Sequence, residues 1–458
     1  MSTENPNLTY ADADPQGLAS ELQVTPAELR RTSISSFLGS ALEYMDFTLY
    51  TLAAALVFGP LFFPNTDPAM ALMASFAAFG SGFLVRPLGG IYFGYLGDKY
   101  GRKSVLVITV GMMGIATLGM GLLPTFAQIG IMAPILLVLL RLIQGFGAGA
   151  ELSGASLLLV ESAPSSKRGF YGAVVALGTA TGVLLASGLW LLLSQMPKDD
   201  FLAWGWRIPF LLSVGTTLVA LYLRRSVSES PVFEAVKARR AAARLEARQQ
   251  SIWRDAADSK KAFLVSLGIK LGENGSVYLV KGFLIGWTVS VVKMDANLVT
   301  TGVTLGSVLG VVTVLLTGKL TDRFGRRKVW LWLSGFQFAF TIPAMLMIET
   351  RNPILVALVF VIFVGGPLPN LYGVESTWLV EMFGSKRRFS FMTTVKEIGA
   401  VLSGGLGPII AASVVAATGP GWIPVAGILM AYAAIGIAAG FFAPETRGRD
   451  LNSEADAF

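Results

Sequence analysis

The chain has 458 residues, of which 53% are hydrophobic and 14% are charged, and its mean hydropathy is +0.63. About a quarter of the residues in a soluble protein are charged, so this composition excludes a soluble protein and predicts an integral membrane protein. The formal net charge of +7 is spread over short segments between apolar stretches, which favours a topology signal over nucleic-acid binding.

The chain contains no cysteine and no histidine. Disulfides and thiolate metal sites are therefore excluded, and the side chain that most readily carries protons near neutral pH is missing. Any proton coupling must use carboxylates. The sequence also shows no metal-binding cluster or nucleotide loop, so we expect no enzyme and no cofactor other than a proton as coupling ion.

Twelve apolar stretches follow a polar N-terminal segment, and each can cross a hydrocarbon core of about 30 Å as a helix. They do not alternate polar and apolar residues, so a β-barrel is not expected. We predict spans at residues 36–60, 70–93, 104–124, 129–157, 169–194, 204–223, 262–291, 297–317, 328–348, 353–378, 389–416 and 421–443.

These spans predict an all-α membrane protein with two pseudo-symmetric six-helix bundles. The expected division is a cytosolic N-terminal tail (1–35), a first bundle (36–223), a cytosolic linker with an amphipathic helix (224–261), a second bundle (262–443) and a cytosolic C-terminal tail (444–458). The loops on one side of the spans hold most of the Lys and Arg residues. The positive-inside bias therefore places both termini in the cytosol.

A repeated motif supports the two halves. Gly94-Tyr-Leu-Gly-Asp-Lys-Tyr-Gly-Arg-Lys103 returns as Gly318-Lys-Leu-Thr-Asp-Arg-Phe-Gly-Arg-Arg327, at an offset of 224 residues. Gly101 allows a tight turn between spans, and Asp98 can accept hydrogen bonds from the free amides of a nearby helix end. A topology signal alone would need the basic residues but neither the glycine nor the aspartate.

A second repeat places a glutamate and an arginine seven residues apart after span four and again after span ten, at an offset of 220 residues. Parallel six-helix halves with a site between them describe one class of secondary transporter. The two repeats contain Gly94, Asp98, Gly101, Arg102, Asp322, Arg326, Glu161, Arg168, Glu381 and Arg388.

The motif resembles the signature of the major facilitator superfamily, of the form Gly-x-x-x-Asp-Arg/Lys-x-Gly-Arg-Arg/Lys. The stretch Arg141-Leu-Ile-Gln144-Gly-Phe-Gly-Ala-Gly149 resembles that family's second signature. This resemblance covers nearly the whole chain. It implies twelve transmembrane helices, transport by alternating access, and a motif loop that latches the two halves on the cytosolic side. The residues of the two repeats are therefore expected to form a gate.

Within that superfamily, the chain is most similar to the metabolite:proton symporters, which carry organic acids, shikimate, proline or betaine. The residues that suggest it include Leu42-Glu-Tyr-Met-Asp-Phe47, Val85-Arg-Pro-Leu-Gly-Gly90, Trp204-Gly-Trp-Arg-Ile-Pro209 and Glu229-Ser-Pro-Val-Phe233. Sugar porters are less similar, because span seven reads Gly272-Glu-Asn-Gly275 and lacks their paired glutamines. The resemblance therefore implies proton-coupled symport of a small metabolite.

Ionisable residues inside spans are functional candidates, because burying a charge at mid-bilayer costs a few kcal/mol or more. Arg86 lies eight residues before the repeated loop, so it is about 12 Å inside the hydrocarbon core. Glu43 and Asp46 share one face of span one at a similar depth, and Tyr50 continues that face. We expect Arg86 to exchange one of these acids for a carboxylate ligand.

Two further stripes carry polar residues at helical spacing. On span four, Arg141 and Gln144 are expected to bind ligand, and Glu151 is a proton candidate closer to the cytosol. A stripe on span seven is expected to line the same water-filled passage. We predict ligand binding by Arg86, Tyr50, Arg141, Gln144, Lys270, Asn274, Tyr278 and Lys281, and proton coupling by Glu43, Asp46, Glu151 and Glu273.

Four cations in one cavity favour an anionic substrate, such as a mono- or dicarboxylate. The alternatives left open are symport of a zwitterion such as proline or betaine, proton-coupled antiport or efflux, and a receptor that binds without transport. The expected setting is the bacterial inner membrane, with membrane lipid and a small molecule as partners, no nucleic acid, and a monomeric chain.

Overall fold

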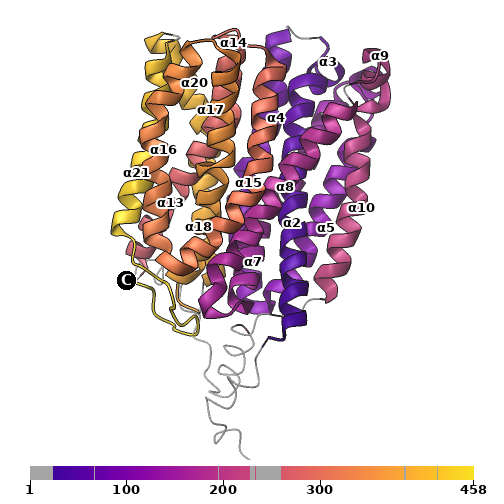
Figure 1. The fold of residues 1–458 in the computed structure, drawn as a ribbon. Helices are drawn as coiled ribbons and strands as arrows, with labels where there is room; N and C mark the ends of the chain where they lie inside the picture. The colour runs from indigo at the N-terminus through magenta and orange to yellow at the C-terminus, as the bar shows by residue number, and fades with distance from the viewer. Residues whose placement is uncertain are drawn as a thin grey trace, which may run out of the picture.

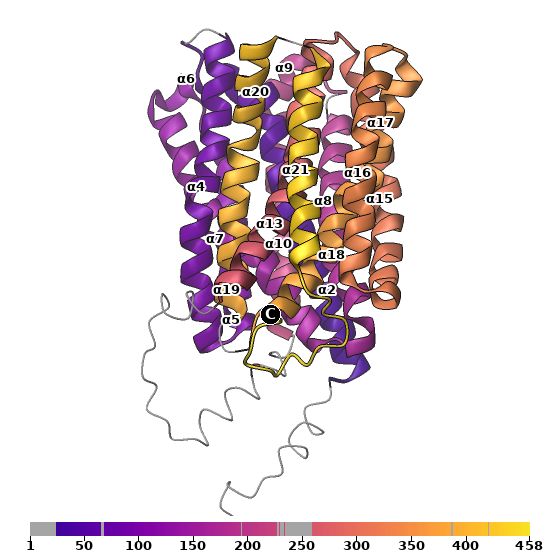
Figure 2. The ribbon, with the colours of Figure 1, turned by 90° about the vertical axis from the view of Figure 1, so that its left-hand side faces the viewer.

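The computed structural model describes residues 24–65, 68–193, 195–226, 229, 233, 259–385, 388–419 and 421–458. Along these residues the chain forms helices and no strand. The helices run side by side in two groups, indigo to magenta and orange to yellow in Figure 1. The quarter turn in Figure 2 shows the same near-parallel arrangement.

The first half begins with a capped helix. The Thr25 side chain accepts from the amide of Glu28, whose side chain in turn accepts from the Thr25 amide, so both free amides are satisfied. The helix therefore starts at Pro26 and not near residue 36. The first half comprises α2 (Pro26–Ala53), η2 (Ala54–Phe58), α3 (Gly59–Phe62), α4 (Pro68–Tyr100), α5 (Arg102–Leu122), α6 (Phe126–Ile129), α7 (Met132–Ser162), η3 (Ser165–Lys167), α8 (Arg168–Leu193), α9 (Lys198–Asp200), η4 (Phe201–Gly205) and α10 (Arg207–Ser226).

The second half repeats this pattern with more interruptions. Its tenth predicted span is broken at Gly366, directly before Pro367, as two prolines in that span predict. The second half comprises α13 (Lys260–Tyr278), η5 (Leu279–Leu284), α14 (Ile285–Ser290), α15 (Ala296–Phe324), α16 (Arg326–Glu349), α17 (Pro353–Gly365), α18 (Pro367–Met382), α19 (Arg388–Gly399), η6 (Ala400–Gly405), α20 (Gly407–Thr418) and α21 (Trp422–Phe442).

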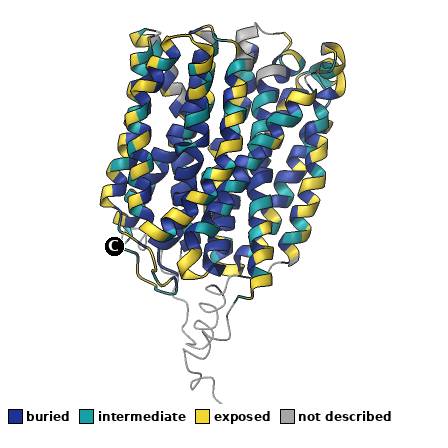
Figure 3. Cartoon of the chain, viewed as in Figure 1, coloured by how far each residue is buried: buried dark blue, intermediate teal, exposed yellow. Residues whose placement is uncertain are grey.

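All twelve predicted stretches are helical along their described residues, within a few residues at their ends. Within the part of the chain that the structure describes, eight helices are long and apolar enough to cross a membrane by length and composition alone. The exposed residues lie mainly on the outer faces of the helices, and the buried residues lie mainly on the faces turned toward neighbouring helices (Figure 3). The linker predicted at 224–261, with its amphipathic helix, lies almost entirely outside the described residues.

The two repeated loops lie at the same end of the bundle, which we call the motif end. Each loop turns at a glycine with a left-handed backbone, Gly101 with φ +105° and Gly325 with φ +94°. The C-terminus also lies at this end (Figure 1).

A close helix crossing fixes the position of Arg86. At Gly149 of α7, a Cβ atom would lie 2.3 Å from the Arg86 carbonyl oxygen and 2.7 Å from the Gly90 nitrogen. Only a residue without a side chain allows α4 and α7 to approach so closely. The backbone that carries Arg86 is thus held against α7.

We expect Gly149→Ala to force α4 and α7 apart and to destabilise the protein by about 1–3 kcal/mol, as overpacking typically does. The measurement is the thermal unfolding midpoint of the purified protein. Gly111→Ala on α5 is the matched control, because nothing lies within 4 Å of the added Cβ atom there. Equal midpoints for the two variants would contradict the expectation.

Candidate functional site

Arg86 of α4 lies at the boundary between the two halves, where it contacts two carboxylates. Its Nη2 is 3.1 Å from Oε1 of Glu43 on α2, within the first half. Its Nε is 2.6 Å and its Nη2 is 3.2 Å from the two carboxylate oxygens of Glu397 on α19, in the second half. All three side chains are at most 6% exposed. The guanidinium therefore joins the halves inside the bundle.

A second charged cluster lies on the second half. Lys270 of α13 is 2.6 Å from Glu273 and 3.3 Å from Glu375 of α18. Lys396 of α19 is 4.0 Å from the same Glu375 oxygen. Both ammonium groups lie over the ring of Tyr372, at 5.3 and 5.0 Å from its centroid. Each buried charge here has an opposite charge nearby, which offsets part of its desolvation cost.

The two clusters share the wall of a small central cavity. It is lined by Glu43, Tyr44, Phe47, Phe83, Arg86, Leu152, Lys270, Asn274, Tyr278, Lys396, Glu397 and Ala400, which come from both halves. Its volume is about 20 Å³, enough for about one water molecule. The water-filled passage predicted from the sequence is therefore not open in this conformation, because the charged side chains fill it by pairing with one another.

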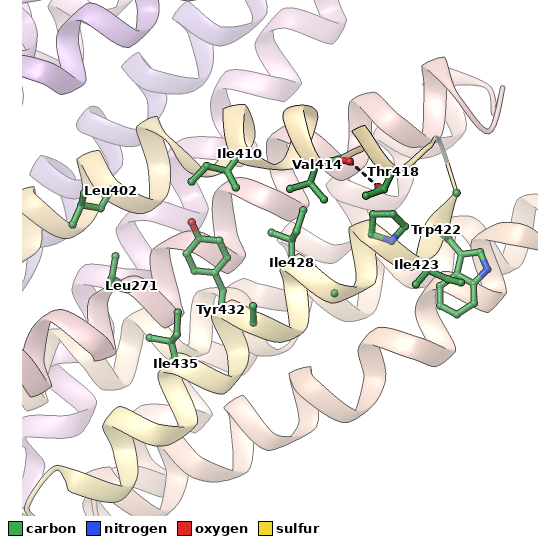
Figure 4. A pocket seen from close by; sticks show the side chains of 14 residues that line it. Leu271, Leu402, Ile410, Val414, Thr418, Trp422, Ile423, Ile428, Tyr432 and Ile435 are labelled. Atoms are coloured by element: carbon green, nitrogen blue, oxygen red, sulfur yellow. Dashed lines mark hydrogen bonds between the residues drawn. The ribbon is translucent and has the colours of Figure 1, made fainter. Parts of the chain in front are cut away.

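A much larger apolar groove lies away from these charges, between α20 and α21. It has a volume of about 1040 Å³ and no charged residue on its wall. Ile410 of α20 faces the Tyr432 side of α21 across the groove (Figure 4). Several of its residues are exposed on the outer surface, such as Ile423 at 68%. The described residues that line the groove include no cation to pair with an anion, so the small central cavity is the candidate site.

Four of the predicted ligand-binding residues line the central cavity, and one predicted proton candidate joins them. Arg86, Lys270, Asn274 and Tyr278 are on its wall, together with Glu43. Asn274 donates to the Ser403 hydroxyl at 3.1 Å. The Tyr278 ring meets the Phe83 ring edge-on, at 5.6 Å between centroids, across the two halves.

Arg141 and its neighbours form a separate site inside the first half, which corrects the prediction that they share the cavity. The Arg141 guanidinium lies over three aromatic rings, including that of Tyr50 at 4.6 Å, and donates to Gln144. Gln144 is 3.3 Å from Asp46, which also accepts from Thr117 at 2.5 Å. None of these residues is on the cavity wall. The aromatic rings separate Arg141 from Arg86.

Three other predicted residues also lie off the wall. Glu151 is paired with Arg224 of α10 and accepts from Thr109 of α5 at 2.9 Å, so it braces three helices of the first half. Glu273 pairs with Lys270, which lines the cavity, but is not itself among the lining residues. Lys281 is half-buried on η5 and is absent from the lining. The stripe on the seventh predicted span therefore reaches the cavity only with its central residues.

Glu397 and Lys396 are not among the ligand-binding or proton-coupling residues predicted from the sequence. The structure places both on the cavity wall, with Glu397 against Arg86. A signal was present, because two adjacent charges inside an apolar span are costly without a function. The partner of Glu397 could not be named, because Arg86 lies 311 residues away in the sequence.

At the motif end, each repeated aspartate binds the start of a helix in the other half. Asp98 accepts from the amide and the hydroxyl of Ser390 on α19, at 3.0 and 2.6 Å. Asp322 accepts from the amides of Gly169 and Phe170 on α8, at 2.7 and 2.8 Å. Free amides at a helix N-terminus favour a negative charge. The repeat in the sequence thus corresponds to two related contacts between the halves.

Glycines allow these contacts to form. At Gly94, a Cβ atom would lie 3.0 Å from the Ser390 Cα, so α4 and α19 touch through backbone. At Gly318, it would lie 2.8 Å from the Gly169 carbonyl oxygen, so α15 and α8 touch in the same way. Both crossings join one half to the other. The motif end is therefore closed.

Buried arginines strengthen this closure. Arg388 of the second half is 2.9 Å from Glu161 of the first half, and Arg102 lies 3.6 Å from the same oxygen. Arg326 pairs with Glu381 at 3.0 Å within the second half. Arg168 forms no ion pair with a carboxylate among the described residues. It donates to the Arg449 carbonyl at 2.5 Å.

The segment after α21 runs across the motif end as a strap, residues 444–458. Arg388 donates to its Leu451 carbonyl at 2.8 Å, and the Ser385 amide donates to its Ser453 carbonyl at 2.9 Å. Leu451 is 1% exposed, so the strap is packed into the core. Because Arg168 of the first half also donates to the strap, the strap joins both halves.

A family model described as the Major Facilitator Superfamily matches residues 36–374. The chain is 40% identical over 411 residues to the shikimate transporter of Escherichia coli (strain K12), covering 88% of this chain and 91% of that protein. It is 34% identical over 444 residues to the proline/betaine transporter of Salmonella typhimurium, covering 95% of this chain and 87% of that protein.

Among solved structures, the fold is similar to that of the proton:xylose symporter XylE bound to 6-bromo-6-deoxy-D-glucose. The TM-score is 0.73 at 16% sequence identity, with 94% of this chain and 99% of that chain covered. At this identity the likeness supports the fold alone. It includes both halves of the bundle.

Proposed function

The chain belongs to the major facilitator superfamily and is a membrane transporter. We propose that it carries a small organic anion by proton-coupled symport. The observation that carries the proposal is the buried Arg86 guanidinium on the wall of the central cavity, between the halves. A guanidinium binds a carboxylate through two parallel hydrogen bonds. Its present partners are carboxylates, so a carboxylate ligand can replace one of them.

The relatives support a small carboxylate as substrate. A shikimate transporter, by its name, carries an organic acid, and it is 40% identical to this chain. The cavity wall adds Lys270 and Lys396 as further cations, and Asn274 and Tyr278 as groups that can bind hydroxyls. A monocarboxylate with a polar ring or chain uses both kinds of group.

The proposed transport cycle alternates between two closures. With the motif end latched through Asp98, Asp322 and Arg388, the site can open only toward the opposite end. Release of the latches and closure of the other end would expose the site at the motif end. The basic loops support a cytosolic motif end in a bacterial inner membrane, with a monomeric chain in contact with lipid and a proton as coupling ion.

A zwitterion such as proline or betaine is the second candidate substrate. The similarity of this chain to the proline/betaine transporter favours it. Its carboxylate would bind Arg86 while its cation lay against an aromatic ring. Phe47 and Phe83 both lie on the cavity wall, but Arg86 already faces them, at 5.1 and 5.8 Å from their ring centroids. A ligand cation would then meet Arg86, which favours the simple anion.

The test is uptake into proteoliposomes that contain the purified chain. Labelled shikimate and labelled betaine are offered separately, with and without an inward acid gradient. We expect shikimate uptake that the gradient accelerates. Uptake of betaine alone would favour the zwitterion. Uptake accelerated by an outward acid gradient would indicate antiport. Binding of either probe without flux would indicate a receptor.

We expect Asp46→Asn to weaken the response to the acid gradient more than the binding of the substrate. Asp46 lies off the cavity wall, and its Oδ1 has no hydrogen-bond partner among the described residues. Binding should stay within about tenfold, because one neutral hydrogen bond contributes about 0.5–1.5 kcal/mol. The measurement compares binding affinity with the ratio of uptake rates with and without the gradient.

Glu151→Gln is the comparison for this variant. Glu151 is fully buried and paired with Arg224, so we expect its loss to lower the thermal unfolding midpoint and to leave the gradient response intact. If Glu151→Gln alone abolished the gradient response, the proton site would belong on α7 and the assignment to Asp46 would be wrong.

A further inference from the structure

Glu397 binds the Arg86 guanidinium in the way that a ligand carboxylate would. Both of its oxygens contact the guanidinium, with Nε to Oε2 at 2.6 Å and Nη2 to Oε1 at 3.2 Å. Glu43 reaches Arg86 through one oxygen only, and its Oε2 has no hydrogen-bond partner among the described residues. Two-point contact is the geometry by which guanidinium recognises free carboxylates. The stronger partner of Arg86 thus comes from the opposite half.

The contact between Glu397 and Arg86 also blocks the cavity to a ligand. While Glu397 is in place, the cavity holds about 20 Å³, too little for any organic anion. At Gly90, a Cβ atom would lie 3.0 Å from the Glu397 Cγ, so the glutamate stem lies directly against the α4 backbone. A ligand can enter only if Glu397 withdraws, and α19 must move with it.

The groups that face Glu397 make its withdrawal depend on its charge. The first half contributes Glu43 and Tyr44 from α2 and Arg86 from α4; the second half contributes Lys270 and Tyr278 from α13, with Lys396 next to it on α19. Ionised Glu397 is held by Arg86 and opposed by ionised Glu43. Protonated Glu397 loses most of its attraction to the guanidinium, while Lys396 keeps Glu375 as a partner at 4.0 Å.

We propose that Glu397 is a resident substitute for the substrate carboxylate, which competes with the substrate for Arg86 and leaves when it takes up a proton. This inference rests on the proposed function and assigns the proton that accompanies substrate binding. Asp46 is left for the step in which the halves reorient. In the empty carrier, ionised Glu397 ties the halves together across the site.

The competition couples proton and substrate without direct contact between them. A proton on Glu397 frees Arg86 and so raises substrate affinity. By linkage, the bound substrate must raise the affinity of Glu397 for its proton by the same factor. Where Glu397 is ionised, substrate affinity should fall by up to tenfold for each pH unit, because one proton is needed for each substrate bound.

The first experiment measures binding of labelled shikimate to the full-length protein in detergent from pH 5.5 to 8.5. Shikimate stays ionised over this range, because an ordinary carboxylic acid has a pKa of about 4. We expect wild-type affinity to fall as the pH rises. Glu397→Gln removes the competing charge, so its affinity should be at least as high as that of the wild type and stay within about twofold at every pH.

Glu43→Gln is the matched control, because it removes the other carboxylate from the same guanidinium. It should keep the pH dependence of the wild type, since Glu397 is still present. A uniformly weaker Glu397→Gln variant that kept the wild-type pH dependence would overturn the proposal and indicate a structural role. A pH-independent Glu43→Gln with an unchanged Glu397→Gln would assign the competition to Glu43 instead.

A second experiment needs no substrate, so it separates failure of this inference from failure of the proposed function. The chain has no cysteine, so spin labels can be attached to Ala127→Cys and Glu349→Cys, which are exposed positions on the two halves. Pulsed electron paramagnetic resonance then gives the distance between the halves in the empty protein. We expect Glu397→Gln to shift this distance at pH 8 as low pH does in the wild type. Identical distance distributions in the wild type and in Glu397→Gln at every pH would refute the proposal that ionised Glu397 holds the two halves together.

Discussion

Arg86→Ala is expected to abolish uptake of a carboxylate substrate. The substitution removes the guanidinium from between Glu43 and Glu397, which lie 3.1 and 2.6 Å from it. Truncating one partner of a buried charge pair costs about 3–5 kcal/mol, because the remaining charge is left unpaired. A loss of that size in substrate binding is a factor of more than 100, which places uptake below detection in proteoliposomes.

Arg86→Lys separates charge from geometry. Lysine keeps the positive charge but cannot make the two-point contact, so we expect weak residual uptake at high substrate concentration. Size-exclusion chromatography and thermal unfolding check that both variants are folded, since two facing carboxylates can relieve their repulsion by sharing a proton. Wild-type uptake kinetics in the alanine variant would reject Arg86 as the substrate anchor.

Arg388→Ala is expected to release the motif end. Arg388 is fully buried and makes three contacts there, with Glu161 of the first half at 2.9 Å, the Phe383 carbonyl at 2.9 Å and the Leu451 carbonyl of the strap at 2.8 Å. The loss of the Glu161 contact destabilises the closed motif end, because that contact joins the two halves. A cost of about 3 kcal/mol shifts the balance toward an open motif end by about 100-fold, and uptake should fall at least tenfold.

The shift can be measured by pulsed electron paramagnetic resonance between labels at Lys167→Cys and Lys328→Cys, exposed residues of the two halves near the motif end. Longer distances are expected in Arg388→Ala. Arg323→Ala is the matched control, because Arg323 is exposed and its ring contact stays within its own helix. Equal distance distributions in the two variants would show that Arg388 is not part of the latch.

Local features of the chain were predictable from residue type and spacing. The spans follow from runs of apolar residues, and Arg86 with Glu43 follows from the cost of placing charges inside such runs. The contact of Asp98 with a helix start follows from the preference of free amides for a carboxylate. These inferences use only short stretches of sequence, and the structure places those residues accordingly.

Other features depend on which surfaces meet and were beyond the sequence. The start of α2 at Pro26 was missed because Thr32, Ser35, Ser36 and Ser40 lower the hydropathy there. In the fold these small polar side chains are buried against other helices, as Ser36 is against the Ala155 carbonyl at 3.3 Å. Likewise, Arg141 was predicted to face the cavity, yet its guanidinium is enclosed by rings of its own half.

The contact of Asp322 with α8 has a consequence for comparing related chains. Its carboxylate holds two main-chain amides, at Gly169 and Phe170, and no side-chain atom of the phenylalanine is involved. The two hydrogen bonds therefore require the aspartate but do not depend on the side chain at position 170. Searches for pairs of positions that mutate together would overlook this contact, although it joins the two halves of the molecule.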